Sequence, residues 1–141
     1  MTALLFVYGT LMRAAAAAGM GREMRARLDA EGTWCGPAAV AGRLYDLGRY
    51  PGLVSSGDAS DAARVHGEVY RLRDPAASFA WLDPYEGIPA GRLRGEEYER
   101  LVRTVVLAGG EQVAAWLYHW HAGIASAVLV PDGRWVPAAR G

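Results

Sequence analysis

The chain has 141 residues, the length of one ordinary domain, and we expect a single domain spanning residues 1–141. Hydrophobic residues make up 52% of it and charged residues 21%, which is ordinary globular usage and excludes an intrinsically disordered chain. The 15 basic residues, all arginine, balance 15 acidic residues, so the formal charge is zero. This balance gives no reason to expect a nucleic acid or a membrane surface as a partner.

The number of cysteines and the lengths of the apolar segments indicate where in the cell the protein is expected. Cys35 is the only cysteine in the sequence, which excludes an internal disulfide and a thiolate metal cage. We interpret it as a small hydrophobic residue of the core. No apolar run approaches the roughly 20 residues of a membrane span, and the opening segment lacks the basic region of a signal peptide. We therefore expect a cytoplasmic protein.

The first elements in chain order are a strand and a helix. Residues 3–8 form a continuous apolar run that ends at Gly9 and suits a strand buried on both faces. The five alanines from Ala14 to Ala18 are interpreted as a surface connection. A helix is expected from about Arg22 to Glu31, after the glycines that interrupt this tract.

The middle of the chain changes to strand-like patterns. We predict a strand from Val40 to Gly48, a turn with a short extended piece over residues 50–54, and a strand from Val65 to Leu72. A short helix follows, with Asp74 as its N-cap and Pro75 as its first residue, and we expect it to stop at Pro84.

The last third predicts a hairpin. Residues 88–96 are expected to be loop, and residues 98–107 and 112–121 alternate as paired strands around the Gly109–Gly110 turn, with one more possible strand at residues 128–130. The sum is an α+β fold, a small mixed, mainly antiparallel β-barrel of five to six strands with flanking short helices.

Three candidate sites have ordinary structural explanations. The glycines Gly19 and Gly21 lack the remaining signature of a nucleotide loop, so a flexible connection is the better interpretation. His119 and His121 share one face of a predicted strand and could join His66 in a metal site, but nothing places His66 nearby. We predict no metal. Cys35 has no evident base to activate it as a nucleophile.

Asp83 and Glu86 stand three residues apart around the predicted helix end, next to Trp81, Tyr85 and Ile88. They could be a solvated acidic turn. Two physical features favour a function instead. A negative charge is disfavoured at a helix C-terminus. A carboxylate among aromatic rings loses hydration, which raises its pKa toward the range that a general base needs.

Six short motifs occur in an order typical of a known family: residues 7–11 (VYGTL), 50–54 (YPGLV), 67–70 (GEVY), 82–87 (LDPYEG), 98–100 (YER) and 115–118 (AWLY). On these motifs the sequence resembles the gamma-glutamylcyclotransferase-like superfamily, in its gamma-glutamylamine cyclotransferase-like branch. The resemblance implies a small β-barrel and an enzyme that releases 5-oxoproline from a small gamma-glutamyl amine or peptide. It implies Glu86 as the catalytic acid and base, and Tyr8, Gly9, Thr10 and Leu11 as the substrate loop.

The motifs also lead us to expect one pocket, with Glu86 at its floor and tyrosines around it. The expected substrate-binding residues are Tyr8, Gly9, Thr10, Leu11, Tyr50, Tyr85, Tyr98 and Tyr118. The reaction requires no cofactor, the expected partner is a small-molecule gamma-glutamyl substrate, and we expect a monomer or weak homodimer. The alternative is a non-catalytic barrel of the same fold that binds a small metabolite or a protein.

Overall fold

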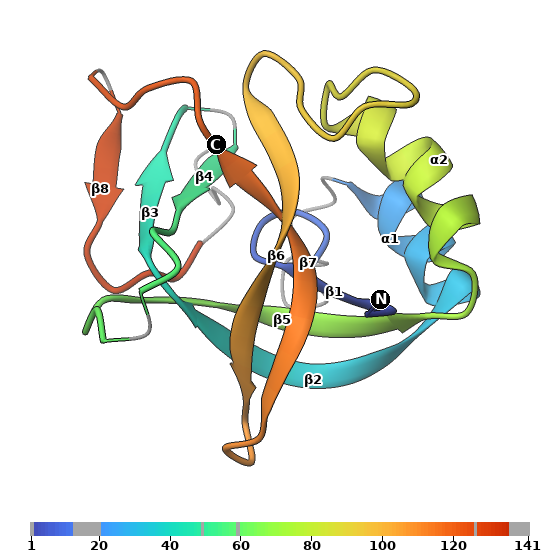
Figure 1. Ribbon diagram of the computed structural model, residues 1–141, viewed down its shortest axis with the longest axis horizontal. Coiled ribbons are helices and arrows are strands. Elements are labelled where there is room, and N and C mark those ends of the chain that lie inside the picture. The colour runs from blue at the N-terminus through green and yellow to red at the C-terminus, as the bar shows by residue number, and fades with distance from the viewer. Residues whose placement is uncertain (1, 13–20, 49, 59, 126, 136–141) are drawn as a thin grey trace.

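The computed structural model describes residues 2–12, 21–48, 50–58, 60–125 and 127–135. The alanine tract and Gly19 lie outside these residues. Five strands close into a barrel in the order β1-β5-β2-β6-β7 (Figure 1). Their bounds are Leu4–Val7 (β1), Arg64–Leu72 (β5), Gly32–Ala41 (β2), Tyr98–Leu107 (β6) and Gln112–Trp120 (β7).

The barrel is mixed, as the sequence predicts. Neighbouring strands run antiparallel except at the closure, where β1 pairs with β7 in parallel through Leu5 and Trp116. All four residues of β1 are buried, which is the pattern expected of a strand covered on both faces. The β6–β7 hairpin has the predicted turn and pairs Tyr98 with Trp120.

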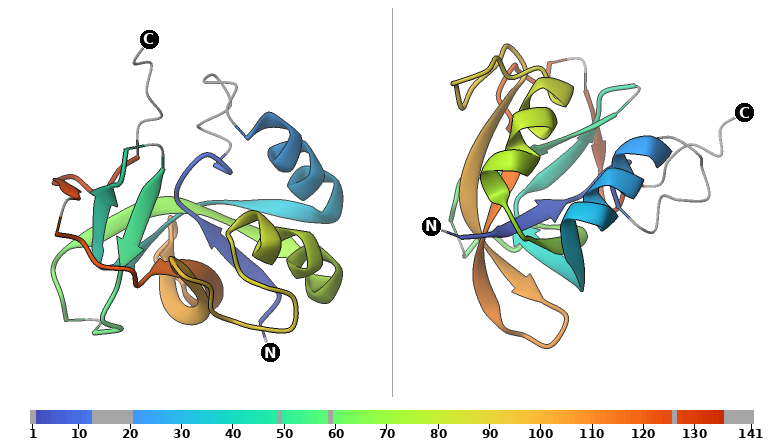
Figure 2. Two further views of the ribbon diagram at one scale, coloured as in Figure 1. Left: turned by 90° about the horizontal axis from the view of Figure 1, so that it is seen from above. Right: turned by 90° about the vertical axis from the view of Figure 1, so that its right-hand side faces the viewer.

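A smaller three-stranded sheet accompanies the barrel, in the order β4-β3-β8. Its strands are Pro51–Val54 (β4), Arg43–Asp46 (β3) and Val128–Val130 (β8). It lies on the side of the barrel opposite the two helices, α1 (Arg22–Glu31) and α2 (Pro75–Tyr85), as both views from the front and from above show (Figures 1 and 2). Neither helix is long and apolar enough to span a membrane, in the part of the chain that the structure describes.

Strand β2 is the main departure from the sequence prediction. The predicted strand began at Val40 and ran to Gly48, whereas β2 begins at Gly32 and β3 is a separate strand after a break at Gly42. The segment from Gly32 to Ala39 has little β-propensity of its own. It becomes a strand because it pairs along its length with β5 and, from Ala38 onward, with β6.

Cys35 also differs from its prediction. The register of β2 against β5 shifts between Trp34 and Gly36, so Cys35 is the extra residue of a β-bulge. Its side chain is exposed rather than part of the core, and its thiol donates to the carbonyl of Thr33. The bulge leaves Cys35 without a backbone partner on β5, at a position where its side chain faces solvent.

Two polar contacts attach α2 to the end of α1. The Trp81 indole and the Ser78 hydroxyl both donate to the Glu31 carboxylate, at 2.9 and 2.7 Å. These bonds lower the pKa of Glu31, because they favour its charged form. They fix α2 beside α1, and with it the C-terminus of α2 at the mouth of the barrel.

Candidate active site

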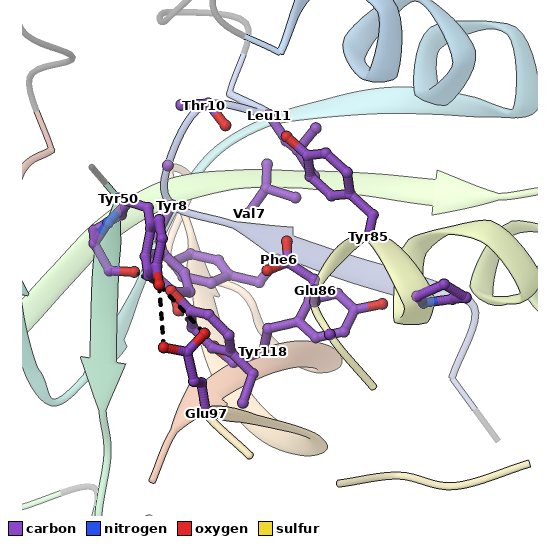
Figure 3. Close-up of a pocket in the computed structure, with 15 residues that line it drawn as sticks. Phe6, Val7, Tyr8, Thr10, Leu11, Tyr50, Tyr85, Glu86, Glu97 and Tyr118 are labelled. Atoms are coloured by element: carbon purple, nitrogen blue, oxygen red, sulfur yellow. Dashed lines mark hydrogen bonds between the residues drawn. The ribbon is translucent and has the colours of Figure 1, made fainter. Parts of the chain in front are cut away.

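A cavity of about 400 Å³ opens where β1 ends, between the C-terminus of α2, the β4 edge and the start of β6 (Figure 3). All eight expected substrate-binding residues and Glu86 line it. The full lining is Phe6, Val7, Tyr8, Gly9, Thr10, Leu11, Tyr50, Pro51, Pro84, Tyr85, Glu86, Gly87, Glu97, Tyr98 and Tyr118. Residues from five separate parts of the chain therefore meet at one place.

The end of α2 follows from its sequence. The helix begins as predicted, with the Asp74 side chain accepting from the Ala77 NH. It does not stop at Pro84, which lies within the last turn. Gly87 adopts a left-handed conformation with φ 78°, and the NH groups of Gly87 and Ile88 bond back to the carbonyls of Pro84 and Asp83. This is a Schellman ending, which favours glycine at that position.

This ending places Glu86 at the C-cap of α2, with its carboxylate directed into the cavity (Figure 3). Ile88 is fully buried and holds the chain against the core just beyond it. Loss of hydration, with a contribution from the charge of Asp83, raises the pKa of Glu86 from 4.5 to about 7. Within the described residues, no side chain donates a hydrogen bond to this carboxylate.

Asp83 has the opposite environment. The Arg100 guanidinium binds both of its oxygens, at 2.9 and 3.1 Å, and the Tyr118 hydroxyl donates to it at 2.7 Å. Arg100 is itself sandwiched, since its guanidinium lies 3.8 Å from the Phe79 ring centroid and 4.5 Å from that of Trp116. The two neighbouring carboxylates thus differ: Asp83 is held in a buried ion pair, and Glu86 faces the cavity.

The turn after β1 forms another wall. The NH of Met12 donates to the carbonyl of Gly9 at 3.0 Å, and Arg25 of α1 donates to the carbonyl of Thr10 at 2.5 Å. Both carbonyls are therefore bound by the protein. Among the described residues, the NH groups of Thr10 and Leu11 have no protein acceptor. Successive free NH groups of this kind can bind an oxyanion or a carbonyl oxygen.

The tyrosines serve the cavity through their rings more than through their hydroxyls. Tyr8 donates to the carbonyl of Tyr118 at 2.5 Å, and Tyr98 donates to the carbonyl of Pro51 at 2.6 Å. Burial is the main cause that raises the pKa of Tyr8, Tyr98 and Tyr118. Tyr50 and Tyr85 are more exposed and stand at the mouth. The three buried tyrosines therefore present their rings to the cavity, while their hydroxyls are bonded to the protein.

Sequence reasoning missed several members of this site. Glu97 lies just before β6, between the loop expected over residues 88–96 and the strand expected over residues 98–107, and it carries no signal of its own in the sequence. Pro51 and Gly87 belong to two of the six motifs, but neither was expected to line the cavity. The glycine after Glu86 does carry a usable signal, because glycine is enriched just past the end of a helix and would have located the end of α2.

The histidines and the single cysteine lie apart from the cavity. His119 pairs with Glu99 at 3.1 Å, and His121 contacts the carbonyl of Gly95 at 2.8 Å. The backbone NH of His66 donates to Gly133. The described residues contain no group of three histidine, cysteine, aspartate or glutamate side chains arranged to hold a metal ion.

Comparison with known proteins agrees with this fold. The family described as gamma-glutamyl cyclotransferase, AIG2-like, matches residues 5–137. The chain belongs to this family. No curated protein sequence matches the chain.

Several solved structures share its architecture. An AIG2-like protein from Mus musculus superposes with a TM-score of 0.70 at 19% identity, covering 95% of this chain and 88% of that one. Protein ytfP from Escherichia coli has a TM-score of 0.60 at 28% identity, covering 94% and 96%. YkqA from Bacillus subtilis has a TM-score of 0.64 at 24% identity; the match covers 96% of this chain but spans only 40% of YkqA.

Proposed function

We propose that this member of the family is an active cyclotransferase, which releases 5-oxoproline from a small gamma-glutamyl amine or peptide. The observation that carries the proposal is the Glu86 carboxylate. It faces the cavity, has no hydrogen-bonding side chain among the described residues, and has a pKa of about 7. A group with that pKa can both accept and return a proton near neutral pH.

The reaction begins with the substrate's own α-amine. This amine has a pKa of about 8 in model compounds, so much of it is protonated at neutral pH and cannot attack. Glu86 removes that proton, and the amine nitrogen attacks the γ-carbonyl carbon. A new C–N bond closes the five-membered lactam, and the bond from the γ-carbon to the leaving amine breaks. After attack, the lactam nitrogen still carries one proton too many. Glu86 gives its proton to the departing amine, accepts this second proton from the lactam nitrogen and passes it to the released amine. The products are a neutral lactam and an ammonium, and Glu86 is again a carboxylate.

The turn supplies the second requirement. Negative charge develops on the γ-carbonyl oxygen during attack, and the NH groups of Thr10 and Leu11 are available to bind it. Because nucleophile and electrophile belong to one molecule, the cavity mainly has to hold the substrate in its folded, attacking conformation. The rings of Tyr8, Tyr98 and Tyr118 form rigid walls for this task, since their hydroxyls are bonded to the protein. The step is an internal acyl transfer with no redox change.

Incubation of the purified protein with a panel of gamma-glutamyl compounds tests the proposal, with 5-oxoproline detected by mass spectrometry. We expect 5-oxoproline with the wild type and none above background with Glu86→Gln. Saturable binding of a panel member without any 5-oxoproline would support the non-catalytic barrel instead.

A further inference from the structure

We propose that a second cavity, at the other end of β4, binds a phosphate group. The inference concerns residues that the proposed reaction does not use, and it stands whether or not Glu86 is catalytic.

The second cavity has a volume of about 200 Å³ and shares no lining residue with the first. Its polar side chains are Ser55, Arg64, Arg103, Thr104 and Gln112. Sites for drug-sized ligands have volumes of roughly 300 to 1,000 Å³. This cavity therefore suits a small ligand, or one charged group of a larger ligand.

The layout of the strands creates the cavity. Strand β6 pairs with β2 only from Val105 to Leu107, because the chain leaves the barrel after β2 and continues into β3 (Figure 1). Within the described part of the chain, Arg103 and Thr104 have no pairing partner on β2. The segment after β4 reaches this gap, where Arg103 donates to the carbonyl of Ser55 at 3.4 Å.

The charge of the second cavity is positive. Its two charged side chains are Arg64 and Arg103, and none of its described lining residues is acidic. Among the described residues, Arg103 forms no ion pair with a carboxylate. Glu99, which lies on the same strand, pairs with His119 instead, at 3.1 Å. A concave surface whose charges have one sign attracts a ligand of the opposite sign, so an anion fits here.

The Arg103 guanidinium is held in place before any ligand arrives. Two of its NH groups donate to the carbonyls of Val102 and Ser55, at 3.1 and 3.4 Å. Its Nε is buried and has no acceptor in the described part of the protein. Gly57 packs close to this atom, since a Cβ there would lie 3.3 Å from it. One NH of each Nη atom remains for a ligand.

Three exposed side chains complete the donors of the cavity: Arg64, Thr104 and Gln112. Arginine donates charge-assisted hydrogen bonds to phosphate and carboxylate oxygens alike. A phosphate monoester carries a charge of about −1.5 to −2 at pH 7, more than the single charge of a carboxylate. Two arginines around a small cavity therefore favour phosphate.

Titration with inorganic phosphate, methyl phosphate and acetate tests the inference, with chloride keeping the ionic strength constant. We expect saturable binding of a phosphate with a Kd of about 1 mM, and binding of acetate about fivefold weaker. Tighter binding of methyl phosphate than of inorganic phosphate would identify a phosphorylated metabolite as the ligand, and the reverse would identify free phosphate. In NMR spectra, the amide signals of Gly57 and Thr104 should shift. Those of Thr10 and Leu11, in the first cavity, should not.

Variants of the two arginines complete the test. Arg103→Gln should raise the Kd for phosphate about tenfold, and Arg64→Gln about threefold, because Arg64 is exposed. Arg92→Gln is the matched control: Arg92 is exposed and lies outside both cavity linings, so its variant should keep the wild-type Kd.

Three results would overturn the inference: binding that does not saturate, amide shifts confined to Thr10 and Leu11, or acetate binding as tight as that of phosphate. A wild-type Kd in Arg103→Gln would overturn it as well. If Arg103→Gln does not fold, Arg64→Gln decides in the same way, since its side chain is exposed.

Discussion

Arg100 of β6 donates two hydrogen bonds to the carboxylate of Asp83 in α2, at 2.9 and 3.1 Å. The two residues are 17 positions apart in the chain. Each side chain retains only 11% of its surface exposure. A carboxylate bound by both arms of a guanidinium is held in place, which suits a structural role. The pairing leaves Glu86 as the carboxylate available to a ligand.

Removing Arg100 should destabilise the fold. Arg100→Met leaves the Asp83 carboxylate buried without its cation, and we expect a loss of about 3 kcal/mol in the free energy of unfolding. The double variant Asp83→Asn with Arg100→Met should recover part of that loss, because the Asn side chain carries no charge and can still accept from Tyr118. Urea unfolding measures both. A loss below about 1 kcal/mol for Arg100→Met would contradict the structural role of the pair.

Replacing Glu86 should abolish turnover. Glu86→Gln keeps the shape of the side chain but cannot accept the amine proton, so we expect kcat to fall by about two to four powers of ten. Ligand binding and the circular dichroism spectrum should remain close to those of the wild type. Glu96→Gln serves as the control and should retain full activity. A Glu86→Gln variant with near-normal kcat would place the base elsewhere, and Asp83 would be tested next.

The raised pKa of Glu86 also predicts a pH-dependent stability. The native carboxyl keeps its proton up to about pH 7, whereas the unfolded chain releases it near 4.5. Between these values the native state binds more protons, so the contribution of this group to the free energy of unfolding decreases as pH rises. Gln does not titrate.

The free energy of unfolding of Glu86→Gln, relative to that of the wild type, should therefore rise by about 2 kcal/mol from pH 4 to pH 8, once partial exposure of the carboxyl is allowed for. Urea unfolding at the two pH values gives the difference. If the two proteins differ in free energy of unfolding by the same amount at pH 4 and at pH 8, the Glu86 carboxyl is as hydrated in the fold as in the unfolded chain.

Gly87 should matter for activity beyond its effect on stability. Gly87→Ala forces a side chain into a left-handed conformation with open space around it, so its cost is backbone strain of about 1 to 2 kcal/mol. Gly110→Ala is a matched control, because Gly110 also has a positive φ and open space but lies in the distant β6–β7 turn. We expect similar losses in melting temperature and a loss of kcat for Gly87→Ala alone. If Gly87→Ala and Gly110→Ala have equal activity, the Schellman ending does not determine the position of Glu86.

Substitution of Gly9 should also lower activity, because a larger side chain there would crowd the cavity. A Cβ atom at Gly9 would lie 3.0 Å from Cγ of Pro51, across the cavity wall. We expect Gly9→Val to lower kcat/KM by about 100-fold, because its methyl groups crowd the NH groups of the turn, with a smaller proportional loss of stability. Gly9→Ala should be intermediate. Activity and melting temperature are measured on the same samples, and an unfolded Gly9→Val would make Gly9 a structural turn residue only.

Local patterns in the sequence determined much of the fold. The apolar run of β1, the cap at Asp74 and the alternation of residues 98–107 each act over a few neighbouring residues, so their patterns predict elements directly. The order of six motifs led to the family, and it named Glu86 and the tyrosines as residues to examine. All of these meet in one cavity, while their roles in catalysis stay predictions.

Other features required partners that are distant in the sequence. Residues 32–39 form a strand only because β5 and β6 pair with them, and their own propensity gives no signal. The parallel contact of Leu5 with Trp116 closes the barrel across 111 residues. The same holds for the site: Asp83 and Glu86 are chemically alike in the sequence. Only the arrival of Arg100 and Tyr118 beside Asp83 decided which carboxylate is paired and which one faces the cavity, because burial and charge pairing are properties of the assembled fold.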